Sequence, residues 1–495
     1  MTPHSPADLL QRIETLRATL DDAVAKSLAQ WKPALTDRGF AAGARNLAAY
    51  LELRRHDLSD LQAGLAAHGL SSLGRSEGHV VATLDALCAT LARITGTAAP
   101  PYPPPGRLMA GARALNRAKT ALFGDDATGA GTRIMVTLPP DAACDPGLAT
   151  RLVEAGMSCA RINCAHDDAA TWRLMAEHVR AAAAAAGRTC RVLMDIGGPK
   201  CRIETIHATD RVRLHRGDRI VLVADLDRAR RDDAVIATLN FPAILADLTV
   251  DAEVWFNDGK IGTRVAAAAE GRIELEVTSA RAKGERLRAE KGVNFPGLEL
   301  RMPPLTDKDL IDLDAVAEVA DLVGFSFVQR PQDIVWLRAE LAQRRPDLPP
   351  MPLVLKIETP LAVSNLPRLL VQGAGGGPIA VMIARGDLAV ELGYARMAEI
   401  QEEIMWLCEA AHVPVVWATQ VLDGLISDGI PTRAETTDAA MAQRAECVML
   451  NKGPFLPEAI RFLADVLRRM DRHQSKKTAR FGRLHSWPAE PMELV

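Results

Sequence analysis

The chain has 495 residues, of which 48% are hydrophobic, so it is too long for one ordinary domain and apolar enough to build large cores. Its 59 basic and 62 acidic side chains give a formal net charge of −3, which argues against a nucleic-acid or anionic-membrane partner. No apolar stretch reaches transmembrane length, no signal-peptide core is found near the N-terminus, and the eight cysteines form no CxxC pair, so we expect a cytoplasmic protein with reduced thiols.

Residues 1–130 are predicted to form a helical region that ends in a linker. Apolar residues recur there at spacings of three and four, which is typical of one face of a helix. The first such series is Leu9, Ile13, Leu16, Leu20 and Val24. A second helical pattern covers residues 74–94, and the proline-rich segment PYPPPG at 101–106 interrupts it.

Eight short apolar runs follow, and helical patterns separate most of them. The runs are TRIMVTL, CARIN, CRVLMD, LVGFSF, LVLKIE, IAVMIA, PVVWAT and CVMLN. Apolar runs of this length, alternating with helices, indicate buried parallel strands with crossover connections. We therefore predict an α/β fold, a TIM (β/α)8 barrel formed by residues 131–202 and 292–475. A doubly wound open sheet is the alternative, and residues 476–495 are predicted to be a C-terminal tail.

Residues 203–291 have a different pattern, with strands punctuated by glycine and Asp-Gly turns. In GRIELEV, at 271–277, apolar and polar side chains alternate, as in a strand with one buried face. This segment is predicted to be a small β domain inserted after the third barrel strand.

Polar residues follow the predicted strands at their carboxyl ends, where barrels of this class carry their active sites. These residues are Arg161, Asn163, Asp195, Lys200, Arg202, Lys356, Glu358, Arg385, Gly386, Asp387, Thr419, Asn451 and Lys452. The carboxylates Glu358 and Asp387 lie on neighbouring strand ends and suit a magnesium ion, although two ion-paired rim carboxylates are the alternative. Lys356 lies on the same strand face as Glu358. A metal with several cations beside it suits a phosphorylated anion.

Three further features are a helix start, a histidine and a glycine-rich segment, of which the last two are weaker signals. Residues Gly386 and Asp387 begin a helix in ARGDL, so their N–H groups could hold a carboxylate. His166 follows the second strand, and both a structural and a ligand-binding role remain open. The glycine-rich GAGGGP at 373–378 lacks the setting of a dinucleotide loop and is interpreted as a surface loop.

Taken in order, these segments resemble the pyruvate kinase family over roughly residues 132–470. The matching segments are TRIMVTLPP, AGMSCARINCAH, MDIGGPKCR, KGVNFPG, LTDKD, FSFVQR, KIE, ARGDL, ATQ and PTRAE. KGVNFPG, at 291–297, resembles the point where that family's chain returns from its inserted domain. Each motif is modest, but ten in order are specific for the family.

The resemblance implies phosphoryl transfer from phosphoenolpyruvate to ADP, followed by protonation of the enolate to pyruvate, with Mg²⁺ or Mn²⁺ as cofactor. Lys356 would neutralise charge on the moving phosphoryl group and Arg161 would bind the substrate phosphate. The implied metal ligands are Glu358 and Asp387. The substrate carboxylate would meet the N–H groups of Gly386 and Asp387, with Thr419 beside the enolate. The residues implied at the nucleotide and its phosphates are Asn163, His166, Arg202 and Lys291.

The same resemblance implies that catalysis does not require potassium. The residues that correspond to potassium ligands in potassium-using relatives are Asn163 and Asp195, but two hydroxyl positions are Ala165 and Ile196 here. Lys200 replaces a glutamate of those relatives, and relatives that work without potassium carry lysine there. We expect its ammonium to lie near Asp195 and to supply the charge of the ion. A solvated lysine on a loop is the alternative.

Three departures from the family pattern leave other functions open. The segment Asn451-Lys452-Gly453-Pro454 replaces Ser-Gly-Glu-Thr after strand eight. The C-terminal regulatory domain is expected to be absent, and the first 125 residues have no counterpart in the typical enzyme. The alternatives are a metal-dependent 2-keto acid lyase or aldolase of the pyruvate-enolate type, or a non-catalytic paralogue that binds a phosphorylated ligand. A homo-oligomer through the barrel or the N-terminal helices is also considered.

Overall fold

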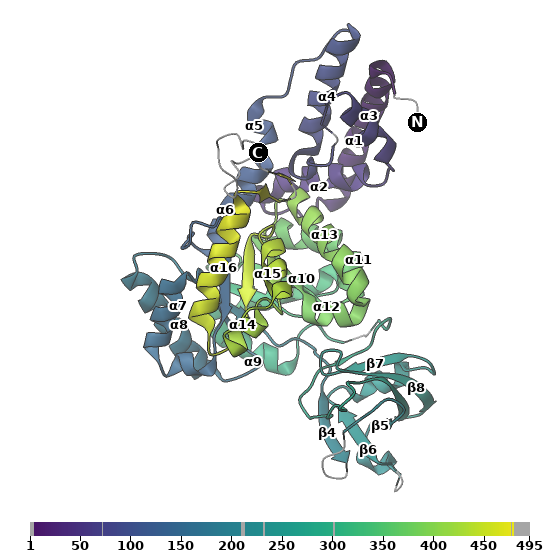
Figure 1. The fold of residues 1–495 in the computed structure, drawn as a ribbon, viewed down its shortest axis with the longest axis vertical. Helices are drawn as coiled ribbons and strands as arrows, with labels where there is room; N and C mark the ends of the chain where they lie inside the picture. The colour runs from purple at the N-terminus through teal and green to yellow at the C-terminus, as the bar shows by residue number, and fades with distance from the viewer. Residues whose placement is uncertain are drawn as a thin grey trace, which may run out of the picture.

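The computed structural model describes residues 4–71, 73–208, 213–230, 233–299, 302–476 and 478–479. Three regions follow one another along its long axis (Figure 1). The N-terminal helices lie at one end, a barrel surrounded by helices lies in the middle, and a separate β sheet projects at the other end.

The N-terminal region is helical, as predicted. Its helices are α1 (Pro6–Trp31), α2 (Ala41–Leu53), α3 (Ser59–Ala67), α4 (Val80–Thr95), α5 (Pro105–Leu108) and α6 (Ala110–Phe123), with short 3₁₀ turns η1 (Arg38–Phe40) and η2 (Glu77–His79). Ser5 caps α1 through a reciprocal capping box with Asp8. The apolar face of α1 predicted from its spacing, Leu9 to Val24, is buried.

The central region is a closed barrel of eight parallel strands. The strands are β1 (Arg133–Thr137), β2 (Cys159–Asn163), β3 (Arg191–Asp195), β11 (Leu322–Phe325), β12 (Leu353–Ile357), β13 (Ile379–Ala384), β14 (Val415–Ala418) and β15 (Cys447–Leu450). The sheet closes between β1 and β15. The predicted (β/α)8 barrel is therefore confirmed, and the open-sheet alternative is wrong.

Helices cover the outside of the barrel (Figure 1). They are α7 (Pro146–Ala155), α8 (Ala169–Ala185), α9 (Asp307–Val319), α10 (Pro331–Arg344), α11 (Pro360–Gly375), α12 (Arg385–Leu392), α13 (Tyr394–Ala410), α14 (Asp423–Asp428), α15 (Arg433–Ala442) and α16 (Leu456–Asp471), with a 3₁₀ turn η3 (Pro140–Ala143) before α7. Because the strands are buried on both faces, their sequences are almost continuously apolar.

The inserted segment forms its own curved sheet with its own apolar core. The strands are β4 (Ile203–Ala208), β5 (Arg219–Val223), β6 (Val235–Leu239), β7 (Glu253–Phe256), β8 (Ile261–Ala269), β9 (Arg272–Ser279) and β10 (Val293–Asn294), in the order β10-β7-β8-β9-β5-β6-β4, with 3₁₀ turns η4 (Leu226–Arg228) and η5 (Pro242–Asp247). The last strand, β10, pairs with β7 just beyond the predicted boundary at residue 291.

Helix α6 belongs structurally to the barrel, although it precedes the first strand. Its last residues, Leu122 and Phe123, are 2% and 0% exposed. Both lie in one apolar cluster with inward-facing strand residues such as Met135, Val354 and Val416. Because these two side chains fill the interior at one end, removing α6 would leave a cavity in the barrel core.

After α16 the described chain contains only a short pair of strands, β16 (Gln474–Ser475) and β17 (Thr478–Ala479). Most of the predicted tail at 476–495 lies outside the described residues. In the described part of the chain, no helix is both long and apolar enough to cross a membrane.

Candidate functional site

Two of the polar residues at the carboxyl ends of the strands, Arg161 and Lys356, contact Asp195, which ends β3 and is 1% exposed. Its Oδ2 lies 2.5 Å from Nη2 of Arg161 and 3.3 Å from Nζ of Lys356. Ser326, which follows β11, donates to Oδ1 at 3.2 Å. Burial raises the pKa of Asp195, but the charges of Lys356 and Arg161 outweigh burial and lower it overall. Asp195 is therefore an ionised anchor that holds two cations.

Lys356 is at the centre of this cluster and reaches it from β12. Its ammonium also lies 3.3 Å from Glu358 and donates to the Ser326 hydroxyl at 2.7 Å. The contact with Glu358 agrees with the spacing of two residues along an extended chain. Ser326 was not singled out from the sequence, although it lies in FSFVQR, one of the segments that resemble the family. The ammonium is thus held by three oxygen-bearing side chains at the barrel mouth.

Two carboxylates follow adjacent strands, Glu358 buried and Asp387 partly buried. Glu358 follows β12 and Asp387 begins α12 after β13, and these strands are paired in register. Burial raises the pKa of Glu358, and the nearby charge of Asp387 raises it further against the opposing effect of Lys356. Each carboxylate is ion-paired with a lysine, Glu358 with Lys356 at 3.3 Å and Asp387 with Lys200 at 2.7 Å, as in the alternative of two ion-paired rim carboxylates. Two such carboxylates at one rim are also a suitable donor set for a hard cation. The described residues include no group of three or more histidine, cysteine or acidic side chains around one point. Two carboxylates fit Mg²⁺, which keeps water or substrate oxygens in its other positions.

Lys200 does not contact Asp195 as expected from the sequence. Its Nζ lies 2.7 and 3.1 Å from the two carboxylate oxygens of Asp387, and 3.9 Å from Asp258 of the inserted sheet. Burial raises the pKa of Asp387, but the charge and hydrogen bond of Lys200, together with the charge of Lys356 and a hydrogen bond from Asn294, lower it overall. The solvated-lysine alternative is also wrong, because the Lys200 side chain is only 17% exposed.

Chain geometry explains where Lys200 points. The turn before it has a glycine, Gly198, with φ +66°, which a residue with a side chain rarely adopts. The Lys200 side chain then runs along Gly292, where an added Cβ would lie 2.6 Å from its Cε. Asp195 already pairs with Arg161 and Lys356, so its charge is balanced without Lys200.

Thr419 and the start of α12 contact each other directly. We expected the N–H of Gly386 to be free for a ligand. In this structure it instead donates to the Thr419 hydroxyl at 2.8 Å. Thr419 has φ +66°, which is unusual for a residue with a side chain. Arg385 holds this turn by donating to the carbonyls of Ala418 and Thr419. A substrate group at this position would have to exchange with, or share, the hydroxyl.

The four residues assigned to the nucleotide are spread over the rim. His166 is exposed, and its pKa is lowered by partial burial and by the charges of Lys452 and Arg202, so these three side chains are electrostatic neighbours. Asn163 accepts the N–H of Ala165 at 3.2 Å. The Arg202 guanidinium donates to the carbonyl of Glu290 at 2.9 Å.

Lys291 is exposed and belongs to the inserted domain. It lines a cationic groove of about 320 Å³ there, which also contains Arg213, Lys260, Arg281, Arg286 and Arg288. The structure thus gathers one cationic set around His166 and another around Lys291. Lys452, for which no role was predicted, belongs to the first set.

Comparison with known proteins identifies a family that this chain matches. Residues 130–454 match the family described as pyruvate kinase, barrel domain. The pyruvate kinase of Mycobacterium intracellulare is 34% identical over 325 residues, which are 64% of this chain and 65% of that protein. The pyruvate kinase of Methylorubrum extorquens is 33% identical over 349 residues, 69% of each chain. The pyruvate kinase of Bacillus licheniformis is 29% identical over 69% of this chain and 57% of its own length. The chain therefore spans about three fifths to two thirds of the length of these relatives.

Proposed function

Because the chain belongs to the pyruvate kinase family, we propose that it transfers the phosphoryl group of phosphoenolpyruvate to ADP and yields pyruvate and ATP. One observation carries this proposal. Lys356 and Arg161, the two cations held by Asp195, lie at the same rim of the barrel as the carboxylates Glu358 and Asp387. Phosphoryl transfer needs positioning and charge stabilisation more than covalent catalysis, and this rim offers both.

Arg161 is proposed to hold the phosphate of phosphoenolpyruvate. Its Nε and Nη2 are anchored on Asp195 and its Nη1 donates to the Thr137 hydroxyl at 3.0 Å, so its direction is fixed before substrate binds. Lys356 is proposed to neutralise the charge that spreads over the phosphoryl oxygens during transfer. Its ammonium is already positioned by Asp195 and Ser326, and it therefore needs little reorganisation.

Glu358 and Asp387 are the residues that would hold Mg²⁺ or Mn²⁺, which when bound draws electron density from phosphate and carboxylate oxygens. The N–H of Phe327 donates to Glu358 at 2.6 Å and fixes one of its oxygens. Lys200 places a positive charge on Asp387, within the same cluster, and we propose that potassium is therefore not required.

The enolate side of the substrate is proposed to meet Thr419, with the N–H groups of Gly386 and Asp387 near the carboxylate. Thr419 can donate its hydroxyl proton toward the enolate while its oxygen accepts from Gly386. Asn163, His166, Arg202 and Lys291 are proposed to face ADP and its phosphates. The positive charges of the partly exposed Arg202 and the exposed Lys291 suit a polyanion that must also leave as ATP.

The decisive experiment incubates the purified full chain with phosphoenolpyruvate, ADP and Mg²⁺ and measures ATP and pyruvate separately. The expected result is equal amounts of both products, and none when EDTA removes the metal. Pyruvate and inorganic phosphate without ATP would indicate hydrolysis of phosphoenolpyruvate instead. Binding of phosphoenolpyruvate with no product would favour the non-catalytic paralogue.

A further inference from the structure

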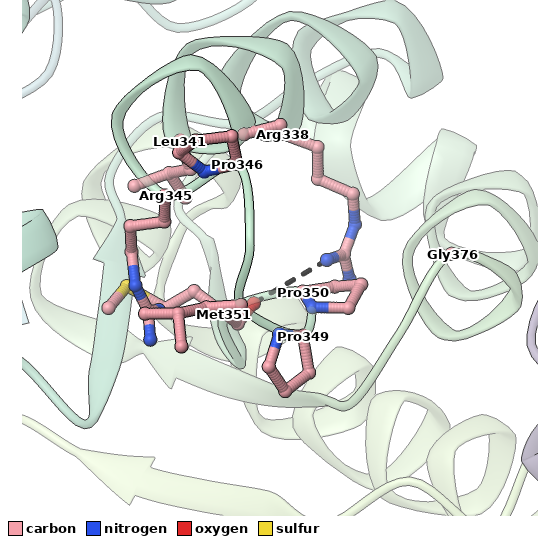
Figure 2. A pocket seen from close by; sticks show the side chains of 10 residues that line it. Arg338, Leu341, Arg345, Pro346, Pro349, Pro350, Met351 and Gly376 are labelled. Carbon is pink, nitrogen blue, oxygen red and sulfur yellow. Dashed lines mark hydrogen bonds between the residues drawn. The ribbon is translucent and has the colours of Figure 1, made fainter.

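A second cavity lies at the amino ends of the strands, opposite the barrel mouth that holds Lys356. It has a volume of about 210 Å³ and opens between the last turns of α10, the segment 346–351 that precedes β12, and Gly376 after α11. Figure 2 shows the side chains of Arg338 and Arg345 extending from the end of α10 toward Pro350 and Met351. None of the residues assigned to phosphoryl transfer lines it.

Arg338 is a charged group whose bonding is incomplete. Within the described residues it donates to the carbonyls of Met351, at 3.4 Å, and Gly373, at 3.0 Å, and its Nε is buried there with no hydrogen-bond partner. Burial lowers the pKa of its guanidinium to about 10, with a small opposing effect from Asp37. The side chain is therefore still charged at neutral pH, and burying such a charge without an anion is costly.

Arg345 has the same deficit on the other side of the cavity, because its Nε is also buried without a partner. Within the described residues, neither Arg338 nor Arg345 forms an ion pair with a carboxylate. Arg344, the neighbouring residue on the same helix, provides a contrast. It lies 2.7 Å from both Asp314 and Glu340. Two arginines seven residues apart thus face one cavity without an anion, while the adjacent arginine has two.

The glycines of the GAGGGP segment give the cavity its thin wall. A Cβ added at Gly377 would lie 3.1 Å from Nη1 of Arg338 and 3.0 Å from Pro350, and one added at Gly376 would lie 3.3 Å from Nε of Arg338. A side chain at either position would displace the guanidinium, which explains why these two positions are glycines. The sequence had suggested only a surface loop here. The remaining wall is mostly apolar and includes Leu341, Pro346, Leu348, Pro349 and Met351.

We propose that this cavity is a second ligand site, which binds a small metabolite carrying a phosphate or carboxylate group on a short apolar body. Guanidinium groups recognise both phosphate and carboxylate through paired N–H donors. An anionic group bound between Arg338 and Arg345 would supply the negative charge that they lack. The apolar walls and the volume suit a short carbon skeleton beside the anionic group. The site lies outside the reaction centre and shares no lining residue with it.

The proposal is tested by equilibrium dialysis of the full chain against radiolabelled inorganic phosphate. Ala342→Trp fills the cavity from the helix surface and leaves both arginines in place, and Ala339→Trp is its matched control on an exposed face of α10 outside the cavity. We expect two phosphate sites in the wild type and in Ala339→Trp, and one in Ala342→Trp. Arg345→Gln should weaken the second site by roughly tenfold or more.

Arg161→Met distinguishes this site from the proposed active site. It should abolish phosphate binding at the active site and leave phosphate binding in the cavity unchanged. Competition by butyrate identifies a carboxylate ligand, whereas phosphate binding that butyrate does not displace identifies a phosphorylated one. Phosphate binding that is the same in the wild type, Ala342→Trp and Arg345→Gln would overturn the proposal. Arg338 would then serve only to join the carbonyl of Met351 before β12 to that of Gly373 in α11.

Discussion

The ammonium of Lys200 lies 2.7 Å from Oδ1 of Asp387, and this contact joins the loop after the third barrel strand to the start of the helix after the sixth. Asp258, at the tip of the inserted sheet, lies 3.9 Å from the same ammonium. One lysine therefore links three parts of the chain that are far apart in sequence. Its charge is fixed beside the carboxylates proposed to hold the metal.

The first prediction concerns potassium. Turnover in tetramethylammonium buffer should be unchanged when potassium is added, because Lys200 already supplies a fixed positive charge in the cluster. Lys200→Glu should lose most of its activity, since it places a third carboxylate beside Glu358 and Asp387. Lys32→Glu makes the same change on the exposed surface and should behave as the wild type. Strong activation of the wild type by potassium would refute this role.

The second prediction concerns Lys356. Lys356→Met should lower turnover by roughly 10²-fold or more, because it removes a preorganised charge from the proposed phosphoryl group. Lys26→Met, on the exposed face of α1, is the control. Chemical unfolding should be recorded for both variants, since Asp195 and Glu358 lose a partner in the first. A folded Lys356→Met protein with normal turnover would contradict the proposed reaction.

The third prediction concerns the metal. Glu358→Gln keeps the shape of the side chain and removes its charge, so the Mg²⁺ concentration for half-maximal activity should rise by roughly tenfold or more. Glu318→Gln removes an equivalent charge from an exposed pair with Arg173 and should leave the Mg²⁺ requirement unaltered. The measurement is activity as a function of Mg²⁺ concentration. Identical curves for Glu358→Gln and Glu318→Gln would exclude Glu358 as a metal ligand.

The fourth prediction concerns helix α6 and its packing in the barrel interior. Phe123→Ala should lower the free energy of unfolding by about 3–5 kcal/mol, because Phe123 is fully buried in the barrel interior. Met109→Ala, 56% exposed, should change it by less than about 0.5 kcal/mol. For the same reason, a chain that lacks residues 1–125 should be far less stable than one that lacks only residues 1–103. Denaturant unfolding curves of equal midpoint for the two truncated chains would show that α6 is dispensable.

The fifth prediction concerns pH. His412 lies where α13 meets the N-terminal helices, and its Nε2 contacts the carbonyl of Gly78 at 3.0 Å. Burial lowers the pKa of His412 despite that contact, so the folded chain favours the neutral ring. Its contribution to stability is therefore complete above the unfolded pKa of about 6.5 and is lost as the pH falls. His412→Gln should show a smaller loss of unfolding free energy between pH 7 and pH 5 than the wild type. The exposed His473→Gln should follow the wild type.

The sequence alone determined the barrel, the inserted sheet and most candidate residues. Parallel barrel strands have no solvent-facing side, and this is why continuously apolar runs in the sequence could be recognised as buried strands. Residues at strand ends must meet at one rim once the barrel closes, and Arg161 and Lys356 do so around Asp195. The contact between Lys356 and Glu358 follows from strand periodicity.

Only the tertiary structure determined which charged side chains form ion pairs with one another. Lys200 pairs with Asp387 rather than Asp195 because the turn at Gly198 and the bare backbone of Gly292 set its path, and neither effect is local in sequence. Leu122 joins the barrel core from a helix that the sequence assigned to a separate region. Local patterns fix which elements form and which side chains they carry. Distances between side chains from different elements depend on how those elements pack, and ion pairing follows those distances.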